Sequence, residues 1–576
     1  MICRSGVGRE CREGISVPFR PALCFSLCVS ALALVIIPSA AAPAWPPAGL
    51  GTGSVYYVST AGSDVTGNGT QSKPWASFYK ADSNIGPGAI VHVMPGTYKI
   101  NPTGSNGVYT RTNGTSANPI TWLSDTWQGA TIDGQGTCFY TWNNAANYVN
   151  IYGFALTGTE PGTNSGSGSC CIVSTGNNVN VGWCHVHDLL PLVAVGIDMC
   201  PKDTSGNYSD GPFTVHDCVI DNIGYGYPYD LCGYGIYDAG AGLIYNNLIY
   251  RCGTYGIHCW HGDSGTRIFN NTIDSVGYSG TAGTFGAGIV AGTGDGGAQP
   301  NTWLQVCNNV ITNCAYLGIF AIEYSPGTLS RTNTIFQNNL VPNYSANSWF
   351  DSYGGWTPLS SNFTVTATVT SNPTFVNSSG GDYHLQSGSP AIDAGNSGIY
   401  FISSTDLDGN PRIVGSSIDI GAYEFQGYNI IGSVTLGNFV GNAAAWPIRL
   451  ILQQNGSVVY AQMVTGSGNP RSFTLPNMYP GTYDLTIEVM PHWLRKVIPG
   501  IVVSNQNLTL GTTTLINGDV NGDNFVEDQD YSLMGAAWYS SVGDSNYNVN
   551  ADLNGDGFVE DQDYSIMGQA WYQSGD

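Results

Sequence analysis

Short strand-like segments recur through the middle of the chain, separated by turns rich in glycine, asparagine and aspartate. Between residues 180 and 345 one short pattern that ends in an aliphatic residue returns every 24 to 38 residues, as Trp183–Val186, Asp217–Ile220, Asn246–Ile249, Asn270–Ile273, Asn308–Ile311 and Asn338–Val341. A Gly-Ile pair recurs with it, at Gly196, Gly235, Gly256, Gly288 and Gly318. Each repeat therefore predicts two or three short strands, and no helical period appears in this region.

Strands this short cannot bury a face alone, so the repeats predict a solenoid in which each coil stacks on the next. One column of the solenoid is polar and consists of Asn247, Asn271, Asn309 and Asn339, continued by Cys218 and Cys184. Stacked amides can hydrogen-bond to one another along the axis, which satisfies these buried polar groups. Two residues further on, an aliphatic column faces inward, formed by Val186, Ile220, Ile249, Ile273, Ile311 and Val341. A β-sandwich rich in Gly and Asn is the alternative, but two synchronous columns at irregular spacing favour a solenoid with loop insertions.

Both ends of this region carry further motifs. Near its start stand Tyr56-Tyr-Val-Ser59, Pro74-Trp75 and Val93-Met-Pro-Gly-Thr-Tyr98, and near its end stand Ser389–Gly395, Asp406–Arg412 and Asp419–Glu424. With these motifs, residues 55–427 resemble the right-handed parallel β-helix families, which include many secreted polysaccharide lyases and glycosidases. The resemblance implies an all-β solenoid and a polysaccharide as substrate or ligand. The well-known catalytic signatures of polygalacturonases and pectate lyases are not found in the sequence.

The composition excludes several classes of protein. Glycine makes up 77 of the 576 residues without the Gly-X-Y period of collagen, and 12 % aromatic with only 10 % charged residues is not the composition of a disordered chain. The formal net charge is −23 and no basic patch is visible, so we expect no nucleic-acid partner.

The first 44 residues have the features of a signal peptide. Four arginines precede an apolar run from Ala22 to Ile37, which is followed by small residues. Because the run is short for a membrane span, we expect cleavage near Ala41 to Ala44 and a secreted mature chain without a membrane span; an uncleaved anchor is the alternative. Eleven cysteines then remain, an odd number, so at least one is expected to lack an intramolecular disulfide partner.

Residues 428–515 differ from the solenoid in composition and in hydrophobic pattern. Cysteine is absent and alternating strands appear, as in Ile448–Gln453 and Tyr483–Val489. The turn at 478–483 resembles one in carboxypeptidase-regulatory-like β-sandwiches. We therefore expect a small β-sandwich that serves as a spacer. Sugar binding through Trp446 or Trp493 is the alternative.

The last sixty residues carry the sharpest pattern in the chain. Two loops, residues 519–530 and 552–563, lie 33 residues apart and place oxygen-bearing side chains at positions 1, 3, 5, 9 and 12. Ca²⁺ takes six to eight oxygen ligands, and this spacing wraps each loop around one ion, with a backbone carbonyl at position 7. The expected ligands are Asp519, Asn521, Asp523, Phe525, Glu527 and Asp530 in the first loop, and Asp552, Asn554, Asp556, Phe558, Glu560 and Asp563 in the second. Each loop is expected to run into a short helix, over 531–538 and 564–571.

The two loop–helix halves are near copies, with 17 of 21 positions identical between 519–539 and 552–572. They resemble a type I dockerin, which implies two calcium ions and docking onto a cohesin module; a solvated acidic tail is the alternative. In the family, positions 10 and 11 often carry Ser or Thr and set partner choice. Here they are Asp528-Gln529 and Asp561-Gln562, so the identity of the partner stays open.

Candidate chemistry in the solenoid follows from the Gly-Ile marker. If its Ile points inward, the next residue points outward, which gives the column Asp198, Tyr237, His258, Val290 and Phe320. Three successive coils then present Asp, Tyr and His, with Lys202, Asp238, Arg251, His261, Asp263 and Glu323 nearby. We expect Asp198, Tyr237, Asp238 and His258 to be catalytic; ordinary surface residues are the alternative. His185, His187 and His216 are expected to be scattered.

The sequence thus predicts a signal peptide (1–44), a right-handed parallel β-helix (55–427), a β-sandwich (428–515) and a calcium-binding dockerin-like module (516–576). One hypothesis is a secreted glycosidase or polysaccharide lyase. The other is a carbohydrate-binding or surface-structural protein without catalysis. Few basic residues lie in the solenoid, which disfavours a highly anionic substrate unless calcium bridges it. Further calcium in the β-helix is left open.

Overall fold

The computed structural model describes two compact units, one ending at Phe425 and one beginning at Gln426. The described residues are 45–47, 50, 53–101, 106–160, 168–189, 195–225, 233–261, 265–277, 286–293, 303–323, 325–352, 355–398, 403–489, 491–504 and 506–576. The expected signal peptide lies outside them. None of the described helices is long and apolar enough to cross a membrane.

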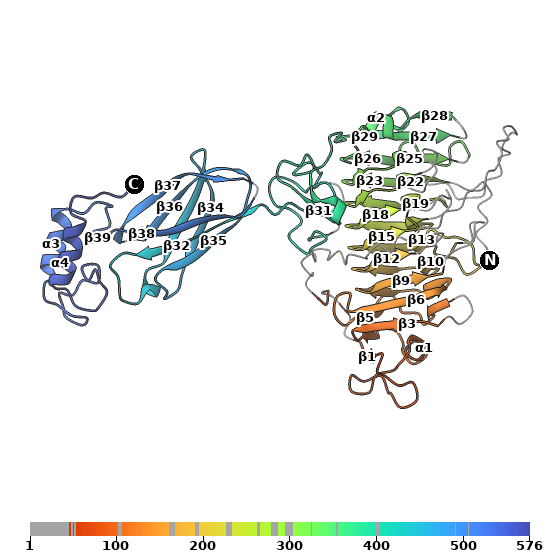
Figure 1. Cartoon of the computed structure of the whole chain (residues 1–576), viewed down its shortest axis with the longest axis horizontal. Coiled ribbons are helices and arrows are strands. Elements are labelled where there is room, and N and C mark those ends of the chain that lie inside the picture. Colours follow the sequence, from red (N-terminus) through yellow and green to blue (C-terminus); the bar gives the residue numbers. More distant parts are fainter. Residues whose placement is uncertain are drawn as a thin grey trace, which may run out of the picture. The chain divides into compact units, whose positions relative to one another are not determined.

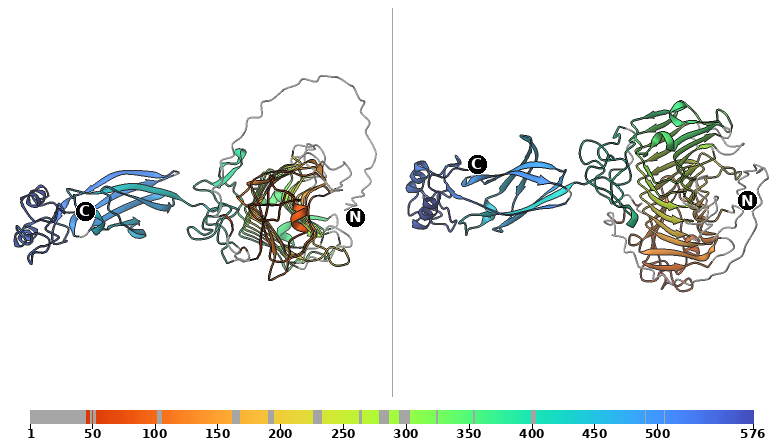
Figure 2. Two further views of the ribbon diagram at one scale, coloured as in Figure 1. Left: turned by 90° about the horizontal axis from the view of Figure 1, so that it is seen from below. Right: turned by 45° about the horizontal axis from the view of Figure 1, so that its top comes forward.

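The first unit is a parallel β-helix with three sheets along its length, and the chain visits each sheet once per coil (Figures 1 and 2). Sheet 1 consists of β1 (Val55–Val58), β2 (Ile90–Val93), β5 (Ile120–Ser124), β8 (Val149–Tyr152), β11 (Val179–Gly182), β14 (Pro212–His216), β17 (Ala241–Tyr245), β20 (Thr266–Phe269), β23 (Leu304–Cys307), β26 (Thr334–Gln337) and β29 (Thr364–Thr366). Sheet 2 consists of β3 (Gly96–Lys99), β6 (Ala130–Cys138), β9 (Ala155–Thr159), β12 (His185–Leu189), β15 (Val219–Ile223), β18 (Leu248–Cys252), β21 (Thr272–Asp274) and β24 (Val310–Thr312).

Sheet 3 carries the column that the Gly-Ile marker predicts. It consists of β4 (Asn106–Thr110), β7 (Tyr140–Asn144), β10 (Cys170–Ser174), β13 (Val195–Met199), β16 (Tyr234–Asp238), β19 (Tyr255–Cys259), β22 (Ala287–Thr293), β25 (Leu317–Glu323), β27 (Ser348–Ser352) and the antiparallel β28 (Gly355–Pro358). Two short helices lie near the ends of the solenoid, α1 (Phe78–Asp82) and α2 (Tyr344–Asn347). The predicted all-β solenoid is confirmed.

The asparagine column is confirmed as a hydrogen-bonded ladder at the bend from sheet 1 to sheet 2. Asn247 Nδ2 donates to Asn271 Oδ1 (2.9 Å), Asn271 Nδ2 to Asn309 Oδ1 (2.9 Å), and Asn309 Nδ2 to Asn339 Oδ1 (3.0 Å). The backbone N–H of Cys218 continues it by donating to Asn247 Oδ1 (3.0 Å). The preceding residue of each pair takes a left-handed conformation, with φ of 53° at Asn246 and 51° at Asn270. Asparagine tolerates this conformation, which accounts for the Asn-Asn pairs.

The aliphatic column and the Gly-Ile marker pack against each other inside the solenoid. Ile220, Ile249 and Ile273 are fully buried and paired in register along sheet 2. A Cβ at Gly235 would come within 2.6 Å of the Ile249 side chain, and one at Gly288 within 2.2 Å of Ile311. Glycine recurs in sheet 3 because the isoleucine side chains of sheet 2 occupy the space that a Cβ would need. Buried free thiols such as Cys184 and Cys252 pack in the same core.

A closing segment, residues 375–425, covers part of the outer face of sheet 2. It contains β30 (Phe375–Asn377) and β31 (Asp382–Leu385), and β31 lies beside β18 (Figure 1). Tyr383 Oη donates to Asp274 Oδ2 (2.7 Å), and Asn270 Nδ2 of the solenoid donates to Asp419 O (3.1 Å) of the segment. The segment is thus fastened to the solenoid by buried polar contacts as well as by apolar packing.

The second unit begins with two packed antiparallel-rich sheets. One is ordered β35 (Arg471–Met478), β32 (Tyr428–Leu436), β38 (Leu508–Leu515), and the other β34 (Ser457–Val464), β33 (Ile448–Gln454), β36 (Gly481–Val489), β37 (His492–Val503), β39 (Asn517–Asp519). Their inner faces share one core, as a β-sandwich requires. Two helices follow, α3 (Asp528–Ala536) and α4 (Asp561–Gln569). Both begin three residues before the predicted starts, because the Asp530 and Asp563 side chains accept hydrogen bonds from the N-cap N–H groups of Glu527 and Glu560.

Candidate functional site

Three of the predicted site residues stand side by side on the outer face of sheet 3. Asp198 on β13 pairs in register with Tyr237 on β16, which pairs with His258 on β19. Adjacent strands are about 4.8 Å apart, so the three side chains follow one another along the solenoid axis. The column continues through Val290 and Phe320, as the Gly-Ile marker predicts.

His261 completes a hydrogen-bonded pair with Tyr237. The distance between Tyr237 Oη and His261 Nε2 is 2.8 Å. The ring of Tyr208 stacks on His261 at 4.1 Å between centroids, and Lys202 Nζ lies 5.0 Å from the centre of the Tyr208 ring. Sequence reasoning places His261 and Lys202 only in the neighbourhood and does not single out Tyr208.

The carboxyl group of Asp198 has a raised pKa. Its Oδ2 accepts a hydrogen bond from Cys170 Sγ at 3.4 Å. Burial raises the pKa of Asp198 to about 6, an effect that Cys170 and the positive potential of His261 and Lys202 oppose. A carboxyl group with such a pKa can hold a proton near neutral pH and release it during a reaction.

Aromatic rings surround His258, which is only 6 % exposed. Its ring lies 4.8 to 5.0 Å, between centroids, from four neighbouring rings, those of Tyr234, Tyr237, Tyr255 and Trp260. Tyr234 and Tyr255 are stacked on each other at 5.2 Å. This side of sheet 3 therefore combines groups that exchange protons with flat apolar surfaces, which is a combination suited to sugars.

Asp238 requires a correction, because the structure does not place it on this face. Strand parity turns it inward, where it is 0 % exposed. Its carboxyl accepts hydrogen bonds from Gly240 N (3.1 Å), Thr266 Oγ1 (3.0 Å) and Cys259 Sγ (3.5 Å). Burial raises its pKa to about 7. Asp238 is thus separated from Asp198, and the two do not form a carboxylate pair in one groove.

The other neighbouring candidates lie elsewhere. Arg251 is on sheet 2, where its Nη2 donates to Ser379 O (2.8 Å) in the closing segment. Glu323 is 1 % exposed and paired with Arg331 at 2.5 Å. Asp263 lies outside the described residues.

Two histidines that the sequence predicts to be scattered, His185 and His187, belong to a second polar cluster, on sheet 2. His185 and His187 lie on the same face of β12, with ring centroids 4.3 Å apart, and His185 Nε2 is 2.7 Å from Asp221 Oδ1. The His-Val-His alternation and its 34-residue distance to Asp221, which pairs with His187, were the signals that could have predicted this cluster. His216 lies apart from it and contacts Asp217 at 2.6 Å.

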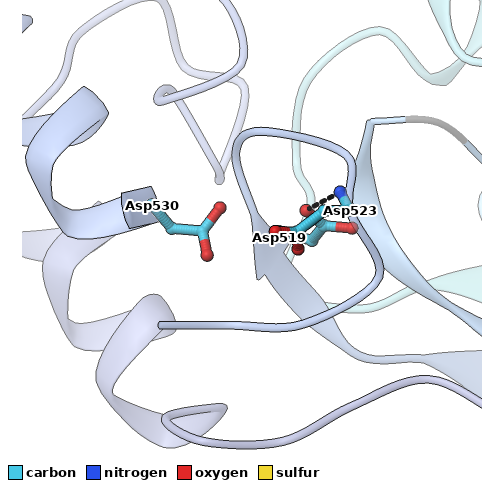
Figure 3. A group of neighbouring side chains, drawn as sticks. All are labelled: Asp519, Asp523 and Asp530. Atoms are coloured by element: carbon cyan, nitrogen blue, oxygen red, sulfur yellow. Dashed lines mark hydrogen bonds between the residues drawn. The ribbon is translucent and has the colours of Figure 1, made fainter. Parts of the chain in front are cut away.

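The first acidic loop gathers three carboxylates (Figure 3). One oxygen each from Asp519, Asp523 and Asp530 lies within 4.8 Å of the others. Asp519 Oδ1 accepts from the N–H groups of Gly522 (2.7 Å) and Asp523 (3.1 Å), which folds the loop around the carboxylates. Burial and the neighbouring carboxylates raise the pKa of Asp519. These oxygens fit a hard divalent cation, because such a cation would relieve their mutual repulsion.

The second acidic loop repeats two of the hydrogen bonds that shape the first. Asp552 Oδ1 accepts from Gly555 N (2.9 Å), as Asp519 accepts from Gly522. Asp563 Oδ2 accepts from Glu560 N at 2.9 Å, the distance also found between Asp530 Oδ2 and Glu527 N. The near-identical sequences therefore repeat these turn hydrogen bonds, whereas among the described residues three carboxylate oxygens gather within 4.8 Å only in the first loop.

Comparison with known proteins agrees with this geometry at the C-terminus. Residues 517–570 match the family described as the dockerin type I domain. No curated protein matches the chain. The first unit of the chain is thus a parallel β-helix, and the second unit contains a region that matches a type I dockerin domain.

Several solved structures are similar at low sequence identity. A type II cohesin–X–dockerin complex from Acetivibrio cellulolyticus matches at 21 % identity over 26 % of this chain and 97 % of that one, with a TM-score of 0.23. Pectate lyase Pel9A matches at 18 % identity over 65 % of this chain and 97 % of that one, with a TM-score of 0.42. A rhamnogalacturonan lyase matches at 15 % identity over 63 % and 95 %, with a TM-score of 0.38.

Proposed function

We propose that this chain is a secreted enzyme that cleaves glycosidic bonds in a polysaccharide and is held to a cohesin-bearing partner by its dockerin. The observation that carries the enzymatic part is the row of Asp198, Tyr237 and His258 on three successive strands, with His261 hydrogen-bonded to Tyr237 at 2.8 Å. Rigid strands hold such groups in a fixed relation, as acid–base catalysis requires.

In hydrolysis, one group protonates the leaving glycosidic oxygen and another removes a proton from the attacking nucleophile. Asp198, with its pKa raised to about 6 by burial, suits the first role. The Tyr237–His261 pair and His258 suit the second, because an unprotonated imidazole nitrogen can accept a proton. Water gives its hydroxyl to the sugar and its proton to the base, while Asp198 gives its proton to the leaving oxygen. A proton then passes from the base to Asp198 through solvent, which restores both groups.

Elimination is the other way to cleave the bond, and it requires a uronate in the substrate. The chain carries 17 basic against 40 acidic residues, so a polyuronate would meet overall repulsion. We therefore favour hydrolysis of a weakly charged polymer over elimination.

A binding-only role is the second candidate, and the four aromatic rings around His258 favour it. Aromatic platforms bind sugars without any chemistry. A β-helix that used sheet 3 in this way would serve as a targeting or adhesive module.

The dockerin part rests on the two acidic loops. Asp519, Asn521, Asp523, Phe525, Glu527 and Asp530 would hold one Ca²⁺, and Asp552, Asn554, Asp556, Phe558, Glu560 and Asp563 would hold a second. The ions would fold and rigidify the loops that position α3 and α4. Binding to a cohesin and location outside the cell follow from this module and from the expected signal peptide.

The test is to incubate the full chain, loaded with calcium, with a panel of polysaccharides. Release of reducing ends without absorbance at 235 nm supports hydrolysis. Reducing ends together with that absorbance would show elimination instead. Retardation on a polysaccharide gel with no product would favour the binding-only role.

A further inference from the structure

A cleft of about 620 Å³ lies at the bends that lead from sheet 3 to sheet 1. Its lining includes Asn147 after β7, Asn177 after β10, and Lys202, Thr204 and Asp210 after β13. Because β7, β10 and β13 are consecutive strands of sheet 3, the cleft runs along the solenoid axis over three coils.

The cleft leads toward the candidate site. Strand β13 carries Asp198, and the chain continues from β13 into residues 201–211, which form one wall of the cleft. From that wall, Lys202 contacts the Tyr208 ring, which stacks on His261, the partner of Tyr237. The cleft therefore occupies the coils before the column, and the two share the coil of β13.

The walls of the cleft are tied together by their own hydrogen bonds. Asn177 Nδ2 donates to Lys202 O (3.1 Å), and Ser209 Oγ donates to Asn177 Oδ1 (3.4 Å). Asp203 Oδ1 accepts from the N–H groups of Ser205 (2.8 Å) and Asn207 (2.9 Å), which fixes the turn at the rim. A ligand thus enters a preformed polar groove, which lowers the entropic cost of binding.

We propose that this cleft is a subsite for a neutral, hydroxyl-rich polysaccharide that lies along the solenoid axis and reaches the Asp198–Tyr237–His258 column. This inference rests on the proposed function. Amide, hydroxyl and carboxylate groups line the cleft, and its ionisable residues are one lysine and two aspartates, which disfavours a polyanion. From β7 to β19 the groove and column extend over roughly 19 Å, about four sugar units, because strands are about 4.8 Å apart.

The experiment fills the cleft with a bulky side chain. Ala145 lines the cleft and is exposed, so Ala145→Trp blocks it with little effect on the core. Ala61→Trp, at an exposed turn near the N-terminal end of the solenoid, is the matched control. The full-length variants are run on gels containing xylan, glucomannan or arabinogalactan, and on gels containing polygalacturonate or alginate. For a retarding polymer, affinity is then measured for oligomers of two to six units.

We expect retardation by at least one neutral polymer and affinity that rises up to about four units. Ala145→Trp should weaken binding about tenfold, the loss of one or two hydrogen bonds, while Ala61→Trp binds like the unchanged chain. Retardation by the acidic polymers alone, or equal binding by Ala145→Trp, overturns the subsite. If the polymer is cleaved but Ala145→Trp binds it as the unchanged chain does, the subsite is wrong and the proposed enzyme is not. If Ala145→Trp loses binding but no polymer is cleaved, the proposed enzyme is wrong and the subsite is not.

Discussion

Removing one amide from the middle of the asparagine ladder should destabilise several coils of the solenoid. Asn271 is 0 % exposed, and its amide uses all four of its hydrogen-bonding positions. Its two N–H groups are shared among Ile244 O, Phe269 O and Asn309 Oδ1, and its Oδ1 accepts from the backbone and side-chain nitrogens of Asn247. Asn271→Ala removes these bonds and leaves buried donors without an acceptor.

The size of the effect follows from these bonds. At roughly 1 kcal/mol net for each of the four bonds, the substitution should cost about 4 kcal/mol of unfolding free energy. With an unfolding entropy of about 2.1 cal/mol/K per residue over some 370 residues, this lowers Tm by roughly 5 °C. Asn339 stands at the other end of the ladder and makes three side-chain bonds, to Val306 O and from Asn309, so Asn339→Ala should cost about 3 kcal/mol.

The assay is calorimetry of the full chain, with hydrogen exchange to locate the loss. Exchange should accelerate in the strands next to Asn271 and not in the second unit. Asn101→Ala, at an exposed position, is the control and should stay within about 0.5 kcal/mol. A Tm for Asn271→Ala equal to that of the control would refute the ladder as a source of stability.

Two further predictions concern calcium and pH. In chelator the dockerin should lose its helical circular dichroism signal and regain it when Ca²⁺ is added. The double variant Asp519→Ala, Asp523→Ala should lose about half of the calcium binding measured by calorimetry. An identical spectrum with and without calcium would count against the metal sites. Burial raises the pKa of Asp419 to about 7 and of Glu424 to about 8, so the folded closing segment holds protons more tightly than the unfolded one. The stability that these two carboxyl groups contribute is therefore fully present below about pH 4 and is lost as the pH rises to about 8. Hydrogen exchange at pH 5 and pH 9 would detect the loss as lower protection factors at pH 9 in residues 389–398 and 403–425; equal protection factors would contradict it.

The repeated features of the fold could be predicted because each coil gives its residues the same surroundings as the last. The Asn247–Asn271–Asn309 column and the inward isoleucines recur at matching positions, so one sequence pattern describes them all. The outward column of Asp198, Tyr237 and His258 follows from the same register. Similarly, the repeated spacing of acidic and glycine residues in the two acidic loops predicts the same turn in both.

Features that do not recur could not be predicted in this way. The excursion over 201–211 folds back so that Tyr208 stacks on His261, a contact between two insertions of different length. The inward side of Asp238 follows from strand parity, yet its partner Thr266 lies 28 residues away in the next coil. Asp221 faces His187 in the register of sheet 2 but contacts His185, and a column alignment does not tell which of the two histidines it contacts.

The most direct test of the enzymatic proposal compares Tyr237→Phe and His258→Ala with the unchanged chain on a polysaccharide that it cleaves. Tyr237→Phe removes only the hydroxyl that contacts His261, so its fold and its binding to the polymer should persist. We expect kcat to fall at least about a hundredfold in both variants, with Tm almost unchanged in Tyr237→Phe. Full turnover by either variant would contradict the assignment of the active face to this column.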